Sequence, residues 1–338
     1  MLDRFRVAVY RFTLRPREEM ILPVYKGAVL RGGFGYVFKR TVCSQPQMTD
    51  CRGCLLQHNC PYPALFDPSP PPDAEVLRKN QDIPLPFVIE PPLERRTRYG
   101  PEDRLSFRLV LIGRAMARLA YFLVVFQQLG EAGIGSRRAK YVLERVEALQ
   151  PWSGDAVTLY EDGALVRGDG GLAVAYGMVA ERAEMLRANG GDTVTVRFVT
   201  PARLKRSGRY VEQPDFHVLA RALLRRISSL SYFHCGQRWE TDYRGLVAAA
   251  ERVETVRARA GWVDWMRYSR RQRRKMNLGG VVGEMTYRGD LEPFWPLLLL
   301  GQLVHVGKAT VFGNGWYELV SAAPSGADGS TELPERRC

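Results

Sequence analysis

The sequence predicts an α+β protein of two tandem ferredoxin-like (RRM-like) domains, with a small cysteine-rich, metal-binding insertion in the first domain. The length of 338 residues suits two domains of roughly 150 residues each. Both halves close with an apolar helix, a glycine loop containing basic residues and a terminal strand, over residues 121–149 and 294–320. Because the ferredoxin-like βαββαβ order places its last helix directly before its last strand, this repetition indicates a duplicated unit.

Hydrophobic periodicity gives the elements of the first domain, residues 1–150. The expected strands span 5–14, 84–92, 105–112 and 141–149, and the expected helices span 24–42 and 114–129. The first helix contains Gly32, Gly33 and Gly35, each of which weakens a helix by about 1 kcal/mol relative to alanine. Glycines at this spacing indicate a close approach of the backbone to another element or to a ligand.

The second domain, residues 151–320, begins at the segment Pro151-Trp152-Ser153-Gly154, which we take as the junction. Its expected helices span 172–188, 215–230, 242–260 and 291–305, and its expected strands span 193–200, 261–268, 280–287 and 316–320. Residues 321–338 are small and polar, so they are predicted to form a disordered tail.

The balance of charge points to a polyanionic partner. The chain carries 49 Lys+Arg against 36 Asp+Glu, a net charge of +13, which favours nucleic acid or an anionic membrane surface. The longest apolar runs, 119–126 and 296–300, are too short to cross a bilayer. The N-terminus has no apolar signal region, so we expect a cytoplasmic protein with reduced cysteines and no membrane partner.

The cations are grouped in segments beside strands and not on an amphipathic helix, which favours RNA or DNA over a membrane. The densest group, with Tyr268 among its cations as a possible stacking partner, consists of Arg267, Arg270, Arg271, Arg273, Arg274 and Lys275. Smaller groups are Arg137, Arg138 and Lys140, and Arg203, Lys205, Arg206 and Arg209. A solvated loop is the simpler interpretation of each group.

Four of the six cysteines cluster within the insertion at residues 43–73. Cys43, Cys51, Cys54 and Cys60 include a CxxC pair, and two thiolates at this spacing can share one tetrahedral metal ion. Structural zinc is the first choice, an iron–sulfur cluster is the alternative, and His58 is a spare ligand. No cofactor is expected for catalysis.

A second glycine loop, residues 307–315, follows the last predicted helix. Gly307, Gly313 and Gly315 can turn backbone N–H groups toward an anion, and Lys308 adds a positive charge. His305 lies just upstream, where it could also be a structural residue at the end of a helix. The order of residues matches neither a Walker A loop nor a dinucleotide fingerprint, and a tight helix-to-strand connection is the simpler interpretation.

Together these motifs resemble the CRISPR repeat-processing endoribonucleases of the RAMP superfamily, in the branch with a cysteine-rich N-terminal insertion. The resemblance rests on the C-terminal GGVVG, YRGDL, FWPL and HVGKAT…FGNG segments of residues 279–315, and on YKG, LRGGFG and CPY near the N-terminus. It implies two ferredoxin-like domains and binding of a CRISPR repeat RNA, which is cut once. The implied chemistry is a metal-independent attack of a ribose 2′-OH, which leaves a 2′,3′-cyclic phosphate (or 3′-phosphate) and a 5′-OH.

Many members of this family carry a catalytic histidine on or just after the first helix, and here that helix has none. Some members rely on basic side chains instead. We therefore expect His305 and Lys308 to face Tyr25, Lys26 or Arg31 across the domain cleft and to form the catalytic site. Two alternatives are a non-catalytic repeat-binding subunit of a CRISPR effector complex and a zinc-stabilised DNA-binding protein, and the chain may be a monomer or a homodimer.

Overall fold

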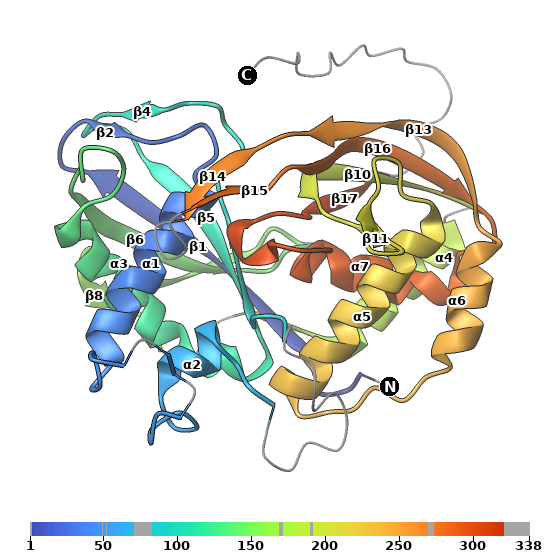
Figure 1. Cartoon of the computed structure of the whole chain (residues 1–338), viewed down its shortest axis with the longest axis horizontal. Coiled ribbons are helices and arrows are strands. Elements are labelled where there is room, and N and C mark those ends of the chain that lie inside the picture. Colours follow the sequence, from blue (N-terminus) through green and yellow to red (C-terminus); the bar gives the residue numbers. More distant parts are fainter. Residues whose placement is uncertain are drawn as a thin grey trace. The chain divides into compact units, whose positions relative to one another are not determined.

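The computed structural model describes residues 2–48, 50–51, 53–70, 83–168, 172–189, 192–269 and 274–320. The chain divides into two compact units, whose elements are labelled in Figure 1. Unit 1 contains the chain up to residue 178 together with 226–240 and 310–313, and unit 2 contains 179–225, 241–309 and the chain from 314 onward. The units are therefore not the contiguous domains 1–150 and 151–320 that the sequence suggests, since each includes segments from distant parts of the chain.

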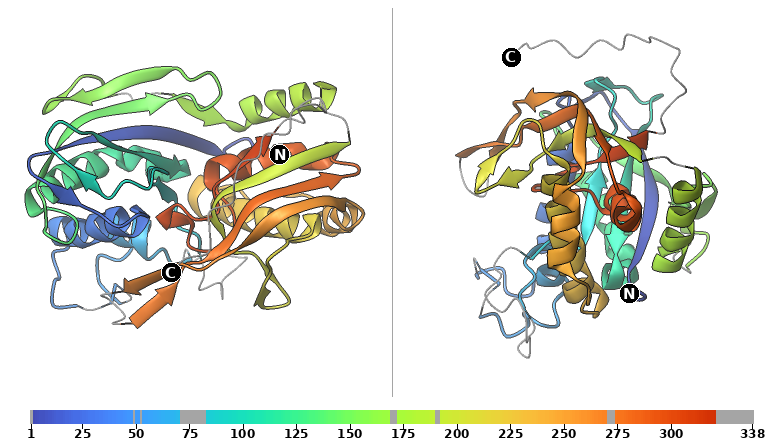
Figure 2. Two further views of the ribbon diagram at one scale, coloured as in Figure 1. Left: turned by 90° about the horizontal axis from the view of Figure 1, so that it is seen from above. Right: turned by 90° about the vertical axis from the view of Figure 1, so that its right-hand side faces the viewer.

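Unit 1 is built on an antiparallel sheet with β1 running through its middle (Figure 2). The main elements are β1 (Arg6–Pro16), α1 (Gly27–Val42), β3 (Phe87–Glu90), β5 (Leu105–Ile112), α3 (Leu119–Ala132) and β6 (Tyr141–Leu149). The strand order β3-β5-β1-β6 is the order of a ferredoxin-like βαββαβ domain. The shorter elements are β2 (Met20–Ile21), α2 (Pro61–Phe66), β4 (Arg98–Tyr99), η1 (Gly113–Arg118), β7 (Ala156–Glu161), β8 (Ala164–Leu165), β9 (Ala173–Ala175) and η3 (Thr310–Phe312).

Aromatic side chains fill the space between this sheet and its helices. Phe34 of α1 stacks on Phe122 of α3 with ring centroids 4.4 Å apart. On the sheet side, Phe12 of β1 stacks on Phe107 of β5 at 5.2 Å. These rings are at most 2% exposed, so they anchor both helices to the same face of the sheet.

Two of the glycines in α1 allow the close packing that the sequence predicts. A Cβ atom at Gly33 would lie 2.9 Å from the side chain of Leu129 in α3, and one at Gly35 would lie 2.8 Å from the ring of Phe66 in α2. Gly32 has no described neighbour within 4 Å of this position. Gly33 and Gly35 are therefore required by packing, whereas Gly32 is not.

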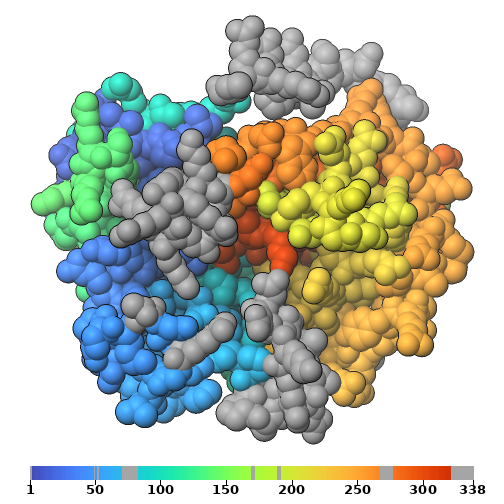
Figure 3. All heavy atoms as spheres, viewed as in Figure 1, coloured from blue at the N-terminus to red at the C-terminus, as the bar shows by residue number. Residues whose placement is uncertain are grey.

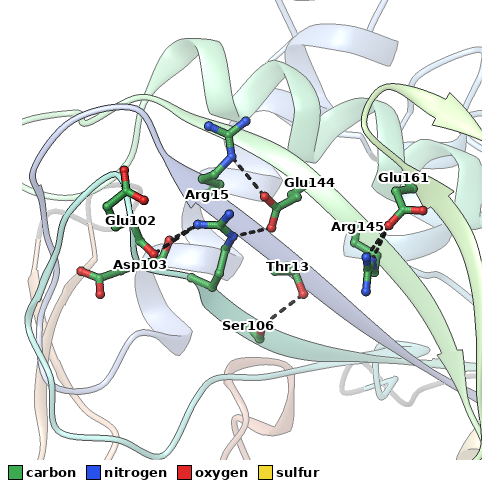
Figure 4. Close-up of polar contacts among 9 residues, drawn as sticks. Thr13, Arg15, Glu102, Asp103, Ser106, Glu144, Arg145 and Glu161 are labelled. Atoms are coloured by element: carbon green, nitrogen blue, oxygen red, sulfur yellow. Dashed lines mark hydrogen bonds and ion pairs between the residues drawn. The ribbon is translucent and has the colours of Figure 1, made fainter.

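The other face of the unit 1 sheet carries compensated charges (Figure 4). Arg15 of β1 and Arg104 both pair with Glu144 of β6, and Arg145 pairs with Glu161 of β7. In the region drawn, the hydroxyl groups of Thr13 and Ser106 also lie within hydrogen-bond distance of each other, at 3.1 Å. These charged and hydroxyl side chains thus pair with one another across the sheet.

Unit 2 repeats the same topology. Its main elements are β10 (Thr193–Ala202), the first half of α5 (Phe216–Cys235), β13 (Glu254–Val263), β16 (Gly280–Arg288), α7 (Trp295–Val304) and β17 (Tyr317–Val320). The antiparallel order β13-β16-β10-β17 corresponds strand for strand to that of unit 1. The remaining elements are α4 (Tyr176–Asn189), β11 (Lys205–Arg206), β12 (Arg209–Tyr210), α6 (Tyr243–Glu251), β14 (Met266–Ser269), β15 (Arg274–Asn277) and η2 (Glu292–Phe294). Among the described residues, no helix is long and apolar enough to cross a membrane.

Two local predictions in the second half of the chain were wrong. The helix expected over 242–260 ends at Glu251, and the chain continues as β13, which pairs with β16 along its whole length. The expected helix at 172–188 begins with the short strand β9, which pairs with β1, before α4 starts. In both places a strand partner far away in the sequence overrides local helical preference.

Candidate functional site

His305 lies at the neck of the glycine loop in unit 2. It ends α7 with a left-handed φ of 63° and is fully buried. Its Nδ1–H donates a 3.0 Å hydrogen bond to the carbonyl of Asn314, and its ring stacks on Trp316 at 6.1 Å. The neighbouring backbone is equally tight, because a Cβ atom at Gly315 would lie 1.8 Å from the carbonyl oxygen of Val306.

Asn314 ties the same loop to the rest of unit 2, a role that the sequence analysis missed. The side chain is fully buried, and its amide donates to the carbonyls of Pro201 at 3.1 Å and Leu278 at 2.8 Å. In the sequence, the one signal of a constrained position was that Asn314 lies between Gly313 and Gly315. Since His305 and Asn314 hold the two ends of the loop together, its shape is fixed by buried polar contacts.

Lys308 is exposed and lies beside a basic and aromatic surface of unit 2. Its backbone N–H donates to the carbonyl of Arg203 at 3.3 Å. The guanidinium of Arg203 lies 4.4 Å from the ring centroid of Tyr210, and the ammonium of Lys205 lies 4.8 Å from the same centroid. The ring of Trp262 lies 5.7 Å from that of Tyr210.

We call Arg203, Lys205, Tyr210 and Trp262 the Tyr210 patch. The β11–β12 hairpin that contributes to it lies at the surface of unit 2, in yellow in Figure 3. The cations of the Tyr210 patch were apparent from the sequence. Its two rings were not, because they come from strands far apart in the chain. Cations held over exposed rings are a common arrangement for binding nucleic-acid phosphates and bases.

The dense basic segment at 267–275 lies mainly on a hairpin. Strands β14 and β15 pair with Tyr268 opposite Lys275 and Ser269 opposite Arg274, and Arg267 faces Met276. Arg270, Arg271 and Arg273 lie outside the described residues. Arg267, Tyr268, Arg274 and Lys275 therefore lie on paired strands, whereas from the sequence alone a solvated loop is the simpler interpretation of this segment.

In unit 1, the start of α1 contacts the other part of the glycine loop. The hydroxyl of Tyr25 donates a 2.7 Å hydrogen bond to the carbonyl of Phe312. The guanidinium of Arg31 lies 5.1 Å from the Phe312 ring and 4.8 Å from the Phe66 ring. Burial, with a smaller contribution from the nearby Glu90, raises the pKa of Tyr25 far above its usual value, so the phenol keeps its proton.

Lys26 is fully buried, unlike its neighbours in the predicted site. Its ammonium donates to the carbonyls of Val24 at 3.1 Å and Glu94 at 2.9 Å, and it lies 5.7 Å from the ring centroid of Tyr99. Desolvation lowers the pKa of Lys26, and the nearby Glu94 partly offsets this effect. Through these contacts, Lys26 holds the start of α1 against the segment that contains Glu94.

The glycine loop of the first half, which follows α3 from Gly133 to Lys140, is a tight turn of unit 1. A Cβ atom at Gly133 would lie 1.9 Å from the carbonyl oxygen of Arg138. Arg137 pairs with Glu19 at 3.4 Å, and the backbone N–H of Lys140 donates to Glu18 at 2.9 Å. Local carboxylates therefore compensate part of the positive charge that the sequence displays here.

The four clustered cysteines lie around one cavity of unit 1, together with Gln45, Gln57 and Tyr62. All four are free thiols. His58 is exposed and does not line the cavity. Within the described part of the chain, no three His, Cys, Asp or Glu side chains stand in a metal-coordinating arrangement.

Comparison with known proteins supports the resemblance. A family model described as an N-terminal domain matches residues 5–169, and the model of the CRISPR-associated endoribonuclease Cas6 matches residues 196–317. The resemblance to CRISPR repeat-processing endoribonucleases is thereby confirmed over the second half of the chain, and the Cas6 family is one of RNA-cleaving enzymes. The α+β fold class is confirmed by the solved structures described next.

Solved structures share this Cas6 fold. A Thermus thermophilus Cas6 superposes with a TM-score of 0.53 at 18% identity, covering 94% of this chain and 99% of that chain. A Cas6 product complex gives 0.52 at 18% identity, covering 94% and 100%. A partial Cas6-RT-Cas1–Cas2 complex gives 0.59 at 13% identity, and the match covers 98% of this chain but 49% of that one. Among curated proteins, no sequence matches.

Proposed function

We propose that this chain is a Cas6-type protein that binds CRISPR repeat RNA in the cytoplasm and cleaves precursor crRNA once per repeat, without a metal ion. A ribose 2′-OH loses its proton and attacks the adjacent phosphorus, and the bond from phosphorus to the 5′-oxygen breaks. The products carry a 2′,3′-cyclic phosphate (or, after hydrolysis, a 3′-phosphate) and a 5′-OH. The Cas6 match over residues 196–317 and the net charge of +13 support this proposal.

The observation that carries the proposal is the contact between the glycine loop and α1 in unit 1. Residues 310–313 belong to unit 1, where Phe312 contacts both Tyr25 and Arg31. We propose that Arg31 binds the scissile phosphate and stabilises the negative charge that develops during the attack. Lys308, which precedes Phe312 by four residues in the sequence, is proposed to contact RNA phosphate as well.

Tyr25 is the proposed proton donor to the departing 5′-oxygen, since its phenol keeps its proton and is half-buried at the same segment. Lys26 and His305 are fully buried, so we propose that they position the reacting groups and do not touch RNA. Lys26 supports the start of α1, and His305 supports the glycine loop. This proposal moves His305 from the catalytic role expected from the sequence to a supporting one.

Binding of the repeat is assigned to the basic surfaces. We propose that the Tyr210 patch binds bases and phosphates, and that the predicted basic residues and glycine-loop N–H groups contact the RNA backbone. The residues in this second group are Arg137, Arg138, Lys140, Arg267, Tyr268, Arg270, Arg271, Arg273, Arg274, Lys275, Gly307, Gly313 and Gly315.

A repeat-binding subunit without cleavage activity is the second candidate function. The observations favouring it are that α1 contains no histidine and that His305 is fully buried. Such a subunit would hold the repeat within a CRISPR effector complex, and one structural relative is part of a larger Cas6-RT-Cas1–Cas2 complex. Both candidates require the same RNA-binding surface.

Single-turnover cleavage in EDTA tests the proposal and separates the two candidates. The protein is mixed in excess with its cognate repeat RNA and with a matched RNA that carries a 2′-deoxy sugar at the cleavage site. We expect one cut in the first RNA, a cyclic phosphate on the upstream product, and binding without cleavage of the second RNA. Tight binding without any cut supports the non-catalytic subunit, and cleavage that requires a divalent cation contradicts the proposed chemistry.

A further inference from the structure

The connection between α1 and α2 brings four thiol groups to one cavity. Cys43 caps the C-terminal end of α1, and Cys60 is the N-cap of α2. Between them, Cys51 and Cys54 flank a turn in which the N–H of Cys54 donates to the carbonyl of Cys51 at 3.2 Å. Although Cys60 lies 17 positions after Cys43 in the sequence, all four side chains line the same cavity.

The described residues of this connection bury little apolar surface. Leu55 is 93% exposed, and Leu56, which lines the cavity, is still 43% exposed. Most of the backbone hydrogen bonds of these residues are local turns, such as that from the N–H of Cys60 to the carbonyl of Leu56 at 2.8 Å, and the side chain of Gln57 also donates to Ser69 at 2.9 Å. A loop of this length without regular structure or a core of its own normally needs a cross-link or a metal ion to stay ordered.

We propose that Cys43, Cys51, Cys54 and Cys60 bind one Zn²⁺ ion in a closed tetrahedral site. Four thiolates complete the coordination shell, so the ion is structural and leaves no open position for catalysis. His58 is not a ligand, because it is exposed and lies outside the cavity lining. Because no three His, Cys, Asp or Glu side chains of the described residues stand in a coordinating arrangement, the proposed site requires the four thiols to move closer together when zinc binds.

The site has a structural consequence for the candidate active site. By fixing Cys60, the ion holds the start of α2, whose Tyr62 and Phe66 rings stack at 5.3 Å. The ring of Phe66, at the end of α2, lies 4.8 Å from the guanidinium of Arg31. Zinc binding therefore orders the Phe66 ring that lies against Arg31. The ion itself does not contact RNA.

Metal analysis of the full-length protein tests this inference. Purified under reducing conditions, the protein is expected to contain one zinc per chain by mass spectrometry of the metal. Cys54→Ser is expected to lose most of this zinc. Cys235→Ser, which changes a thiol in α5 outside the cluster, is expected to keep it.

A second measurement keeps the inference testable if Cys54→Ser does not fold. Zinc is removed from the wild-type protein with a chelator, and Co²⁺ is added. Absorption bands of tetrahedral Co²⁺ with thiolate ligands, displaced by one equivalent of Zn²⁺, support the site. A protein that contains no metal and takes up none, or that contains iron and labile sulfide with visible absorption, overturns it.

Discussion

The hydroxyl of Tyr25 donates a 2.7 Å hydrogen bond to the carbonyl of Phe312, across 287 positions of sequence. This bond fastens a short piece of the C-terminal glycine loop to the start of the first helix, within unit 1. The residues on either side of that piece belong to unit 2. The contact therefore joins two segments from opposite ends of the chain within one unit.

Tyr25→Phe removes this hydrogen bond and leaves a partly buried carbonyl without its donor. We expect the free energy of unfolding to fall by roughly 1–2 kcal/mol, measured by urea denaturation. If Tyr25 also donates the proton to the leaving oxygen, the single-turnover rate falls by much more than the RNA affinity. Tyr36→Phe on the exposed side of the same helix is the control, and equal losses in the two variants would contradict this role.

Gly27→Ala and Gly32→Ala form a matched pair within α1. A Cβ atom at Gly27 would lie 2.0 Å from the carbonyl oxygen of Phe312, whereas Gly32 has no described neighbour within 4 Å. We expect Gly27→Ala to lower stability by about 2 kcal/mol and to slow cleavage, because the loop segment must move. Gly32→Ala should stabilise the protein by up to about 1 kcal/mol through helix propensity. Indistinguishable variants would show that this contact is absent in solution.

His305→Ala distinguishes a positioning role from direct catalysis. The residue is fully buried, has a left-handed φ of 63° and bonds to the carbonyl of Asn314. We expect stability and cleavage rate to fall together, and His305→Gly to recover part of both, because φ 63° with ψ 174° is a conformation that essentially only glycine adopts without strain. Loss of cleavage with unchanged thermal stability in both variants would instead place the imidazole in the reaction.

Tyr210→Ala tests the binding surface of unit 2. Removing a ring that stacks on a base costs about 1–3 kcal/mol, which corresponds to a roughly 5- to 150-fold weaker affinity for repeat RNA. Tyr210→Phe keeps the ring and should bind nearly as well as the wild type. The control is Tyr243→Ala in α6, where the side chain is about as exposed, at 37% against 39%. An unchanged affinity for Tyr210→Ala in filter binding would remove the ring from the RNA interface.

Because His234 is buried, we expect the protein to lose stability in mild acid. Burial, assisted by the charges of Arg226 and Arg114, lowers the pKa of His234 from 6.5 to about 4, although its bond to the carbonyl of Pro84 works in the opposite direction. The unfolded chain therefore takes up a proton near pH 6.5 that the folded chain refuses, and stability falls as the pH drops from 6.5 to 4. The full effect is about 3 kcal/mol.

His234→Gln checks this linkage. The glutamine amide can still donate to the carbonyl of Pro84 but cannot take up a proton in this range. The difference in unfolding free energy between wild type and variant should shrink steadily as the pH falls from 7 to 4. A constant difference would mean that His234 does not contribute to the acid sensitivity.

Much of the fold could be predicted from the sequence because its signals are local. The alternation of buried and open positions along β1, and the apolar helices before each terminal strand, led to the duplicated βαββαβ order. The glycines at 33 and 35 correctly indicated close packing. The segment at 254–263 escaped prediction because its strand conformation depends on pairing with β16, from Glu254 opposite Arg288 to Val263 opposite Gly280.

By itself, the sequence determined the fold class, the family resemblance and a set of candidate site residues, since periodicity, spacing and charge are written along the chain. Only the tertiary structure decided which of those residues are buried and which contact one another. It buried His305 and Lys26, placed Phe312 on Tyr25 and Arg31, and assembled Tyr210 and Trp262 with two cations. Burial and distant contacts are set by how whole elements pack, and no single stretch of sequence carries that information.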